Sequence, residues 1–388
     1  MAKIAEAFSL IRNGANIKQG LDDSGYPITR IETISNRTVD RNKMGYAGVT
    51  DISKYSDYVL QDGDLLMSHI NSETHLGKVA LYEKQEDETI IHGMNLLCLR
   101  PKKEMLDSRY AFYYLSSDAF LRQIPRITKK SVNQASFNVA ALKELAILIP
   151  EIEKQRNIVR GMDKVSELIA LRKEQLAKLD QLVKSRFIEL FGDPVADSMK
   201  WGQIPLSHYL KSIRYGTSTP PAFSETGYEF IRATNIKSGK IVDSDMKYIS
   251  EEEAKKLKKC KVLGGEMIIV RSGVNAGDTC IITEEHCGQY AGYDMILVFT
   301  EELHPVFVNV LLNTEYMDRV VKPLTRRAAQ PHLNSEQVQS LPIIQVPYDQ
   351  QKQFASFVEQ TDKSKLVIQQ SLDKLELLKK SLMQEYFG

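Results

Sequence analysis

Two stretches of the chain repeat apolar residues at steps of three and four, the first from Ile158 to Leu190 and the second from Phe354 to Tyr386. Neither Pro nor Gly occurs between 162 and 191 or between 350 and 387. This heptad spacing predicts two long helices with a coiled-coil seam. The predicted seam positions are Ile158, Met162, Val165, Ile169, Leu176, Leu179, Val183, Phe354, Val358, Ile368, Leu372, Leu375 and Leu382. The series is interrupted at Arg172, Arg186, Thr361, Lys365 and Lys379.

Each predicted helix is long for a globular domain. About 36 residues at a rise of roughly 1.5 Å give a rod of about 54 Å. The alternative is that each helix packs only on the domain before it. A seam of this length outruns the face of a domain of about 150 residues, whose radius of gyration is roughly 15 Å. Two equal seams in one chain can instead cover each other, and we expect them to pair antiparallel.

The regions before the two helices have a different pattern. Short apolar runs such as DLLMSHI and NLLCLR in the first half, or EMIIVRSG and DMILVF in the second, are strand-like in length and composition. Helical patches follow at 107–124 and 304–321. The predicted fold class is therefore α+β, with two similar α/β domains separated by a pair of long antiparallel coiled-coil helices.

The two halves are copies of one unit. Phe191-Gly192 and Phe387-Gly388 lie 196 positions apart (387 − 191), and the same offset pairs Gln155 with Gln351 and Ser185 with Ser381. Nearer the start of each half the offset is 202 (213 − 11), which pairs Ile11 with Ile213. This many matches in order indicate an internal duplication. We assign domains to 1–150 and 203–347, helices to 151–192 and 348–388, and a linker to 193–202.

Composition adds limits to this picture. Hydrophobic residues make up 43% of the chain and no apolar run approaches a membrane span. The four cysteines contain no CxxC pair, so a reducing cytoplasm is the expected compartment. The formal net charge is only +1, which argues mildly against nucleic-acid binding, although a local basic face can exist on a neutral chain.

Sequence signatures of catalysis are absent. The chain has no GxxxxGK[ST], GxGxxG, HExxH or GxSxG, and its seven histidines are not spaced as metal ligands. We therefore expect neither an enzyme nor a metal site.

The order of motifs resembles the specificity subunit of type I restriction–modification systems over nearly the whole chain. The motifs are GDLLMSHI (63–70), GEMIIVRSGVNAG (265–277), QASFN (134–138), QPHLN (330–334), GYEFIRATNIKSGKI (227–241) and LFGD (190–193). They are accompanied by a Pro and a Gln near each helix start, at Pro150 and Gln155 and at Pro347 and Gln351. The first half departs from the pattern, with MSHINSETHLG where the second has IVRSGVNAG.

The resemblance implies two target recognition domains, each reading one half of a split, asymmetric site in double-stranded DNA. It implies that the helices set the spacing and bind two modification subunits, which restriction/translocase subunits join. It further implies that this chain is non-catalytic and holds no cofactor, with S-adenosylmethionine, ATP and Mg in the partner subunits.

Candidate DNA-binding residues follow from these motifs. Arg can bond guanine, and Asn adenine, with two hydrogen bonds. A basic pair precedes each Gln-x-x-x-Asn frame, and Arg12 and Arg214 stand beside equivalent glycines. The candidates are Arg12, Asn13, Lys18, His69, Asn71, Lys129, Lys130, Gln134, Arg214, Tyr215, Arg271, Ser272, Asn275, Arg326, Arg327 and Gln330.

Two other functions fit the sequence. One is a structural adaptor whose paired domains bind proteins and never meet DNA. The other is the specificity chain of a fused type II restriction enzyme.

Overall fold

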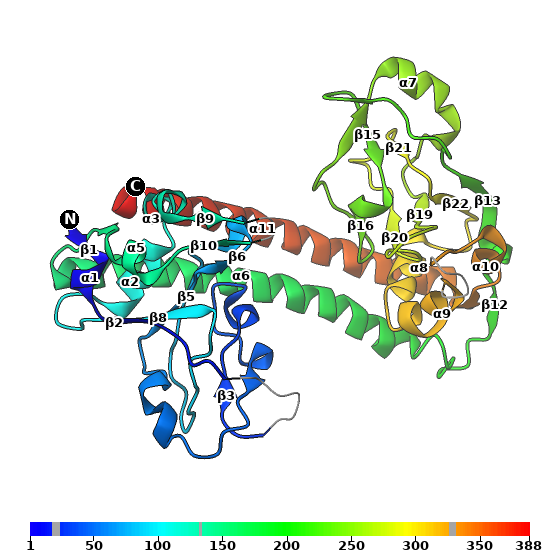
Figure 1. Ribbon diagram of the computed structural model, residues 1–388. Helices are drawn as coiled ribbons and strands as arrows, with labels where there is room; N and C mark the ends of the chain where they lie inside the picture. The colour runs from blue at the N-terminus through cyan, green and yellow to red at the C-terminus, as the bar shows by residue number, and fades with distance from the viewer. Residues whose placement is uncertain (18–23, 132–133, 326–330) are drawn as a thin grey trace. The chain divides into compact units, whose positions relative to one another are not determined.

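The computed structural model describes residues 1–17, 24–131, 134–325 and 331–388 (Figure 1). The chain divides into two compact units. Unit 1 comprises Met1–Arg172 with Ser371–Gly388, and unit 2 comprises Lys173–Gln370. Each unit therefore contains one globular domain and part of both long helices.

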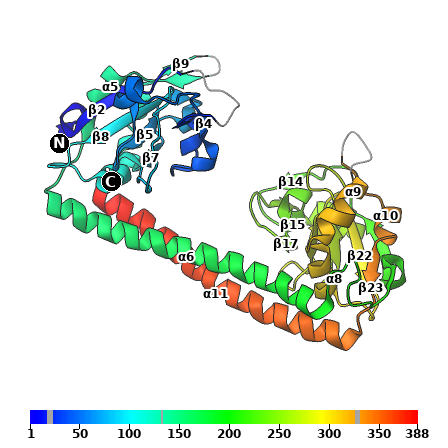
Figure 2. The same cartoon turned by 90° about the horizontal axis from the view of Figure 1, so that it is seen from below.

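The core of unit 1 is a four-stranded antiparallel sheet with the order β2-β8-β5-β7 (Figure 2). Successive side chains of a strand point to opposite faces, and here both faces are covered. Leu65 and Met67 of β5 enter one apolar cluster with Tyr110, whereas Leu66 enters another with Cys98. This double burial explains the continuous apolar runs. The strands are β2 (Phe8–Asn13), β5 (Leu65–Ser68), β7 (Val79–Leu81) and β8 (Leu96–Pro101).

Shorter elements surround this sheet. Strand β1 (Ala2–Lys3) pairs with β11 (Ala146–Ile147), and β3 (Pro27–Ile28) pairs with β4 (Gly45–Tyr46). A three-stranded sheet has the order β6-β10-β9, formed by β6 (Ile70–Asn71), β10 (Ala135–Ser136) and β9 (Lys129–Lys130). The helices are α1 (Ile4–Ala7), α2 (Ser108–Leu115), α3 (Asp118–Leu121), α4 (Ile124–Ile127) and α5 (Val139–Lys143).

Unit 2 repeats the central sheet of unit 1. Its order is β13-β22-β19-β20 (Figure 1). The register between β13 and β22 shifts between Leu210 and Ser212. The register between β2 and β8 shifts between Phe8 and Leu10, at the same offset of 202 (210 − 8). A shared irregularity at equivalent positions supports the duplication. The strands are β13 (Leu210–Tyr215), β19 (Met267–Ile269), β20 (Thr279–Ile281) and β22 (Met295–Phe299).

The remaining elements of unit 2 form three smaller sheets and several helices. Strand β12 (Gln203–Pro205) pairs with β23 (Pro342–Ile344), and β16 (Ile236–Lys237) pairs with β17 (Lys240–Ile241). The third sheet is β14 (Phe223–Ser224), β18 (Lys247–Ile249), β15 (Tyr228–Ile231) and β21 (Tyr290–Ala291). The helices are α7 (Glu251–Lys256), α8 (Pro305–Leu312), a π-helical Met317–Val321, α9 (Lys322–Thr325) and α10 (Ser335–Gln339).

The two long helices are α6 (Ile152–Phe191) and α11 (Tyr348–Phe387), of 40 residues each. A glutamine in the first turn ties each helix to its domain. Gln155 is buried, accepts the amide hydrogen of Asp107 at 2.9 Å and donates to the carbonyls of Met105 and Pro150. Gln351 makes the equivalent three bonds in unit 2, to His304, Glu302 and Val346. This explains why a glutamine is repeated at each helix start.

Within each unit the two helices run antiparallel. In unit 1 the end of α11 meets the start of α6, since Phe387 and Met162 share one core cluster. In unit 2 the end of α6 meets the start of α11, where Phe187 lies 5.5 Å from Phe354 between ring centroids. The predicted fold class is thereby confirmed. The helix ends also pack on the domains, so pairing and domain packing coexist.

The predicted seam positions are buried or half-buried. Buried members are Ile158, Met162, Val165, Val183, Phe354, Val358 and Leu372; half-buried members are Ile169, Leu176, Leu179, Ile368, Leu375 and Leu382. Among the described residues, no helix has the length and apolarity needed to cross a membrane. The same residues contain no group of three or more His, Cys, Asp or Glu placed to hold a metal ion.

Candidate nucleic-acid interface

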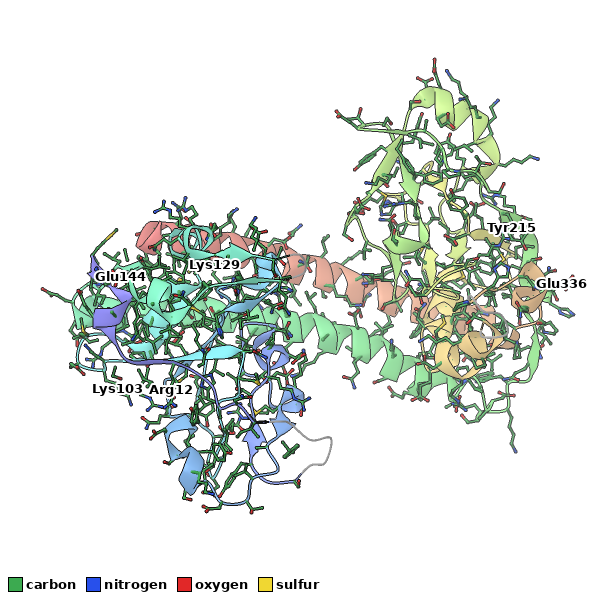
Figure 3. All side chains as sticks on the ribbon, viewed as in Figure 1. Arg12, Lys103, Lys129, Glu144, Tyr215 and Glu336 are labelled. Carbon is green, nitrogen blue, oxygen red and sulfur yellow. The ribbon has the colours of Figure 1, made fainter. Side chains whose placement is uncertain are left out.

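In unit 1 the small sheet β6-β10-β9 brings three parts of the chain together. Ala135 of β10 lies opposite Asn71 of β6 on one side and Lys130 of β9 on the other. Lys129, Lys130 and the neighbouring Gln134 are exposed (Figure 3 labels Lys129). An amide, a second amide and two ammonium groups therefore share one edge of the unit, a set suited to both bases and phosphates.

Local bonds hold this edge in place. The Asn71 side chain accepts the amide hydrogen of Ser72 at 2.7 Å, and Lys130 pairs with Glu73 at 2.7 Å between exposed side chains. The Asn of the QASFN frame has a structural role. The Asn138 side chain accepts a hydrogen bond from the amide of Ala141 and thereby caps α5.

Unit 2 builds the equivalent edge from the loop after β19. Ser272 bridges to His332, the position equivalent to Ser136, and its hydroxyl lies 2.9 Å from His332 Nδ1. The Arg271 guanidinium lies over the Tyr215 ring at 5.1 Å from its centroid. Val274 at the loop tip is 98% exposed. The loop thus presents a stacked arginine and a bare apolar side chain to solvent.

Other bonds in unit 2 brace this loop. Asn275 donates to the carbonyl of Ala233 at 3.1 Å, and Asn334 caps α10 through the amide of Gln337. The Tyr215 hydroxyl accepts from the amide of Ser335, next to Glu336 (Figure 3). The structure therefore brings Tyr215, Arg271, Ser272 and Asn275 together. Lys18, Arg326, Arg327 and Gln330 lie outside the described residues.

Some predicted contact residues have structural partners instead. Arg214 pairs with the buried Glu266 through two bonds of 2.9 and 2.6 Å and also donates to the carbonyls of Lys259 and Lys261. Arg12 lies over the Tyr58 ring at 3.9 Å from its centroid, half-covered, while Asn13 beside it is exposed. Both arginines have structural partners within their domains, and their contact with DNA stays a prediction.

His69 is also placed beneath the surface. Its side chain is 4% exposed, and burial lowers the pKa of its imidazole to about 4. A buried neutral histidine cannot reach a base edge without rearrangement. Its counterpart Arg271 is more exposed, so the two units differ in what they offer at this position.

Sequence reasoning missed two residues of this edge, Val274 and His332. The signal for His332 was available, because the offset of 196 places it on Ser136 within the repeated frame (332 − 136). No comparable signal marked Val274, since exposure of an apolar side chain at a loop tip depends on the fold of the loop.

Comparison with known proteins places these features in one family. The chain matches the family model of the type I restriction modification DNA specificity domain over residues 1–181 and 219–377. It is 30% identical to a putative type I restriction enzyme MjaX specificity subunit of Methanocaldococcus jannaschii, over 98% of this chain and 91% of that protein. It is 25% identical to the type I restriction enzyme EcoKI specificity subunit of Escherichia coli, over 47% of this chain and 40% of that protein.

The fold agrees with solved structures. It resembles the S subunit of a type I restriction–modification system from M. genitalium with a TM-score of 0.60 at 15% identity, over 100% of this chain and 95% of that one. A chain from a study of type I complex assembly gives 0.54 at 15% identity, over 100% and 96%. The match of the family model across both halves shows that this chain belongs to the type I restriction–modification DNA specificity family, as a non-catalytic specificity subunit.

Proposed function

We propose that each unit reads one half of a split, asymmetric site in double-stranded DNA, and that the long helices fix the spacing of the halves. The observation that carries this proposal is the repeated edge: the same two segments pair in both units but present different side chains. A duplicated scaffold with divergent exposed groups suits two different half-sites. In this proposal residues 1–150 and 203–347 are the target recognition domains, 151–192 and 348–388 the helices, and 193–202 the linker.

Within this edge we assign different tasks to different side chains. Arg271, Ser272 and Asn275 of unit 2 and Asn71 and Gln134 of unit 1 are proposed base readers, because guanidinium and amide groups match base edges. Lys129 and Lys130 are proposed phosphate contacts, because an exposed ammonium is a point charge without base preference.

Replacing Arg271 by alanine should relax one half-site and leave the other half and the spacer unchanged. Loss of a good bidentate contact costs about 1–3 kcal/mol of discrimination at one base pair. The measurement is methylated-base mapping in cells that express the complete modification complex. A K129Q/K130Q variant is the contrast: binding should weaken across all sequences, and its salt dependence should become shallower. Methylation by R271A that keeps full selectivity at both halves would contradict the assignment, and an absence of DNA binding would favour the adaptor.

The partners are proposed to be modification subunits, two in number, with restriction/translocase subunits joining them. S-adenosylmethionine is expected in the modification subunits, and ATP and Mg in the restriction subunits. Both long helices carry exposed apolar residues that support two equivalent contacts. Unit 1 presents Leu171 of α6 and Leu378 of α11, which are 46% and 45% exposed. Unit 2 presents the equivalent residues, 196 positions away in each case. Val367 corresponds to Leu171 (367 − 171) and is 66% exposed, and Leu182 corresponds to Leu378 (378 − 182) and is 46% exposed.

We expect L171E/L378E to remove one modification subunit and L182E/V367E to remove the other. A carboxylate placed in a desolvated apolar contact should weaken each association by at least about tenfold. Native mass spectrometry of the assembled complex counts the subunits that remain. A K164E/K380E variant introduces acids at other exposed positions of the same two helices in unit 1 and should keep the full complement. Equal loss in this control variant would mean that charge alone, and not the apolar pair, governs assembly.

A further inference from the structure

Unit 1 contains a cavity that the proposed DNA-binding role does not use. Its volume is about 230 Å³, and charged groups form much of its wall. Three arginines, Arg37, Arg41 and Arg109, line it together with Glu83, Tyr113 and Asp163. Asp163 belongs to α6, so the wall joins the globular domain to the long helix.

Two of the three arginines are satisfied by acids. Arg109 donates to Asp163 at 3.0 Å and also pairs with Glu83, while the Tyr113 hydroxyl donates to Asp163 at 2.6 Å. Arg41 makes a bidentate pair with Glu88 at 2.8 and 2.7 Å. These bonds satisfy the donors of Arg41 and Arg109 that face the acids, and leave Arg37 as the arginine of the wall to explain.

Arg37 is held at a cost and has an unmet donor. Its backbone is left-handed, with φ of 60°, a conformation that a residue with a Cβ disfavours. Its Nη1 atom is buried and has no hydrogen-bond acceptor among the residues that the structure describes. Asp118, an exposed acid, acts on it only as a nearby charge, and burial is the larger influence, lowering the pKa of the guanidinium below its ordinary range. A buried donor without an acceptor is unfavourable, and more so for a cation.

Unit 2 provides an internal comparison for this position. The offset of 202 places Gly239 there (239 − 37), and its φ is also left-handed, at +83°. Glycine is the ordinary residue for such a backbone. The second copy thus has the residue that the conformation favours, whereas the first has a long cation.

The equivalence of the two positions is fixed on both sides by hydrogen bonds. In unit 1 the carbonyl of Thr33 accepts from Asp40, and in unit 2 the carbonyl of Asn235 accepts from Val242, again 202 positions on. Arg41 has no counterpart either, since Asp243 stands at its position (243 − 202). The cavity is therefore a feature that distinguishes the two copies.

We propose that this cavity binds a carboxylate group, held by the guanidinium of Arg37. A buried guanidinium donor without an acceptor calls for an acceptor, and a planar carboxylate matches the guanidinium fork. A phosphate dianion would add a second charge beside Glu83 and Asp163, which oppose it. The volume lies below the roughly 300 Å³ at which drug-sized sites begin, so the occupant is a small carboxylate or an Asp or Glu side chain of a protein partner.

The test compares the wild-type chain with R37G, the residue that unit 2 uses. Glycine relieves the left-handed strain, so R37G should fold at least as well as the wild type. In thermal unfolding at equal ionic strength, sodium acetate should raise the melting temperature of the wild type above its value in sodium chloride. R37G should lose this increment, with affinity lower by about tenfold or more, and R37K should keep part of it. Inorganic phosphate should act more weakly than acetate.

A second arm distinguishes the two sources of the carboxylate. If a partner side chain fills the cavity, acetate should weaken binding of the modification subunit to the wild type, and R37G should bind it more weakly and ignore acetate. The proposal is overturned if R37G keeps the acetate response, if phosphate is the stronger ligand, or if acetate affects neither unfolding nor assembly. It stands apart from the DNA-binding role, because R37G should leave both half-sites unchanged.

Discussion

Removing the two acids that face Lys365 should destabilise unit 2 by about 3 kcal/mol, whereas replacing the lysine by methionine should be close to neutral. Lys365 of α11 occupies a seam position and is 8% exposed. Its ammonium lies 2.7 Å from Asp180 of α6 and 3.2 Å from Asp362. Both acids are about half exposed and can return to water. The lysine is the buried partner, so D180N/D362N leaves a buried charge without a counterion. K365M instead leaves two half-exposed acids, of which Asp362 still pairs with Lys240, and fills the seam.

Denaturant unfolding followed by Trp201 fluorescence measures this effect, since the single tryptophan of the chain lies in unit 2. The exposed pair Lys178–Glu174 on α6 provides the control, and E174Q should leave the unfolding free energy nearly unchanged. A neutral D180N/D362N variant, or a K365M variant that loses several kcal/mol, would contradict the asymmetry. A loss of unfolding free energy confined to D180N/D362N would indicate that Lys365 serves to fix the register between the two helices.

Lys365 also shows what can and cannot be predicted from the sequence. The heptad pattern marks it as a break in the seam, but not its partner, because Asp180 lies on the other helix and the pattern does not fix the register between two helices. The repeated Gln155 and Gln351 are similar. The duplication singles them out, and only the fold shows that they accept and donate bonds to the loop before α2 or α8.

Some strands and helices could likewise be predicted from the sequence, and others could not. The apolar runs predicted β5 and β8 because both faces of the sheet are buried. The two-residue strands β6, β9 and β10 gave no signal, since pairing of Asn71 with Ala135 is a contact between distant segments. The helical patch at 107–124 is broken between α2 and α3, because Ser117 caps a new helix through the amide of Phe120. Local side-chain competition with the helix explains this break.

The two units should respond to pH in opposite senses through their buried titratable groups. In unit 1 burial lowers the pKa of His69 to about 4 and that of His92 to about 3. Their pKa values in the folded protein lie below the ordinary 6.5. The stability that these neutral histidines contribute to unit 1 is therefore complete above pH 6.5 and is lost as the pH falls through 4 and 3. In unit 2 burial raises the pKa of Asp294 to about 6, against a bond from the Arg271 amide that lowers it. The stability that the protonated Asp294 contributes to unit 2 is complete below pH 3.8, the ordinary pKa of aspartate, and is lost as the pH rises through 6.

Variants separate the effects of His69, His92 and Asp294 on stability from those of the other titratable groups. Relative to the wild type, H69N/H92N should gain stability in unit 1 as the pH falls from 6.5 to 4, by about 3 kcal/mol for the His69 shift. D294N should gain a similar amount in unit 2 as the pH rises from 4 to 7. Hydrogen exchange, corrected for intrinsic rates, reports on each unit through β5 and β8 or β19 and β22. Slopes of the same sign in the two units would contradict the prediction. Opposite slopes would mean that the two copies of one fold respond to pH through different buried groups, so that acid below pH 6.5 destabilises unit 1 more than unit 2.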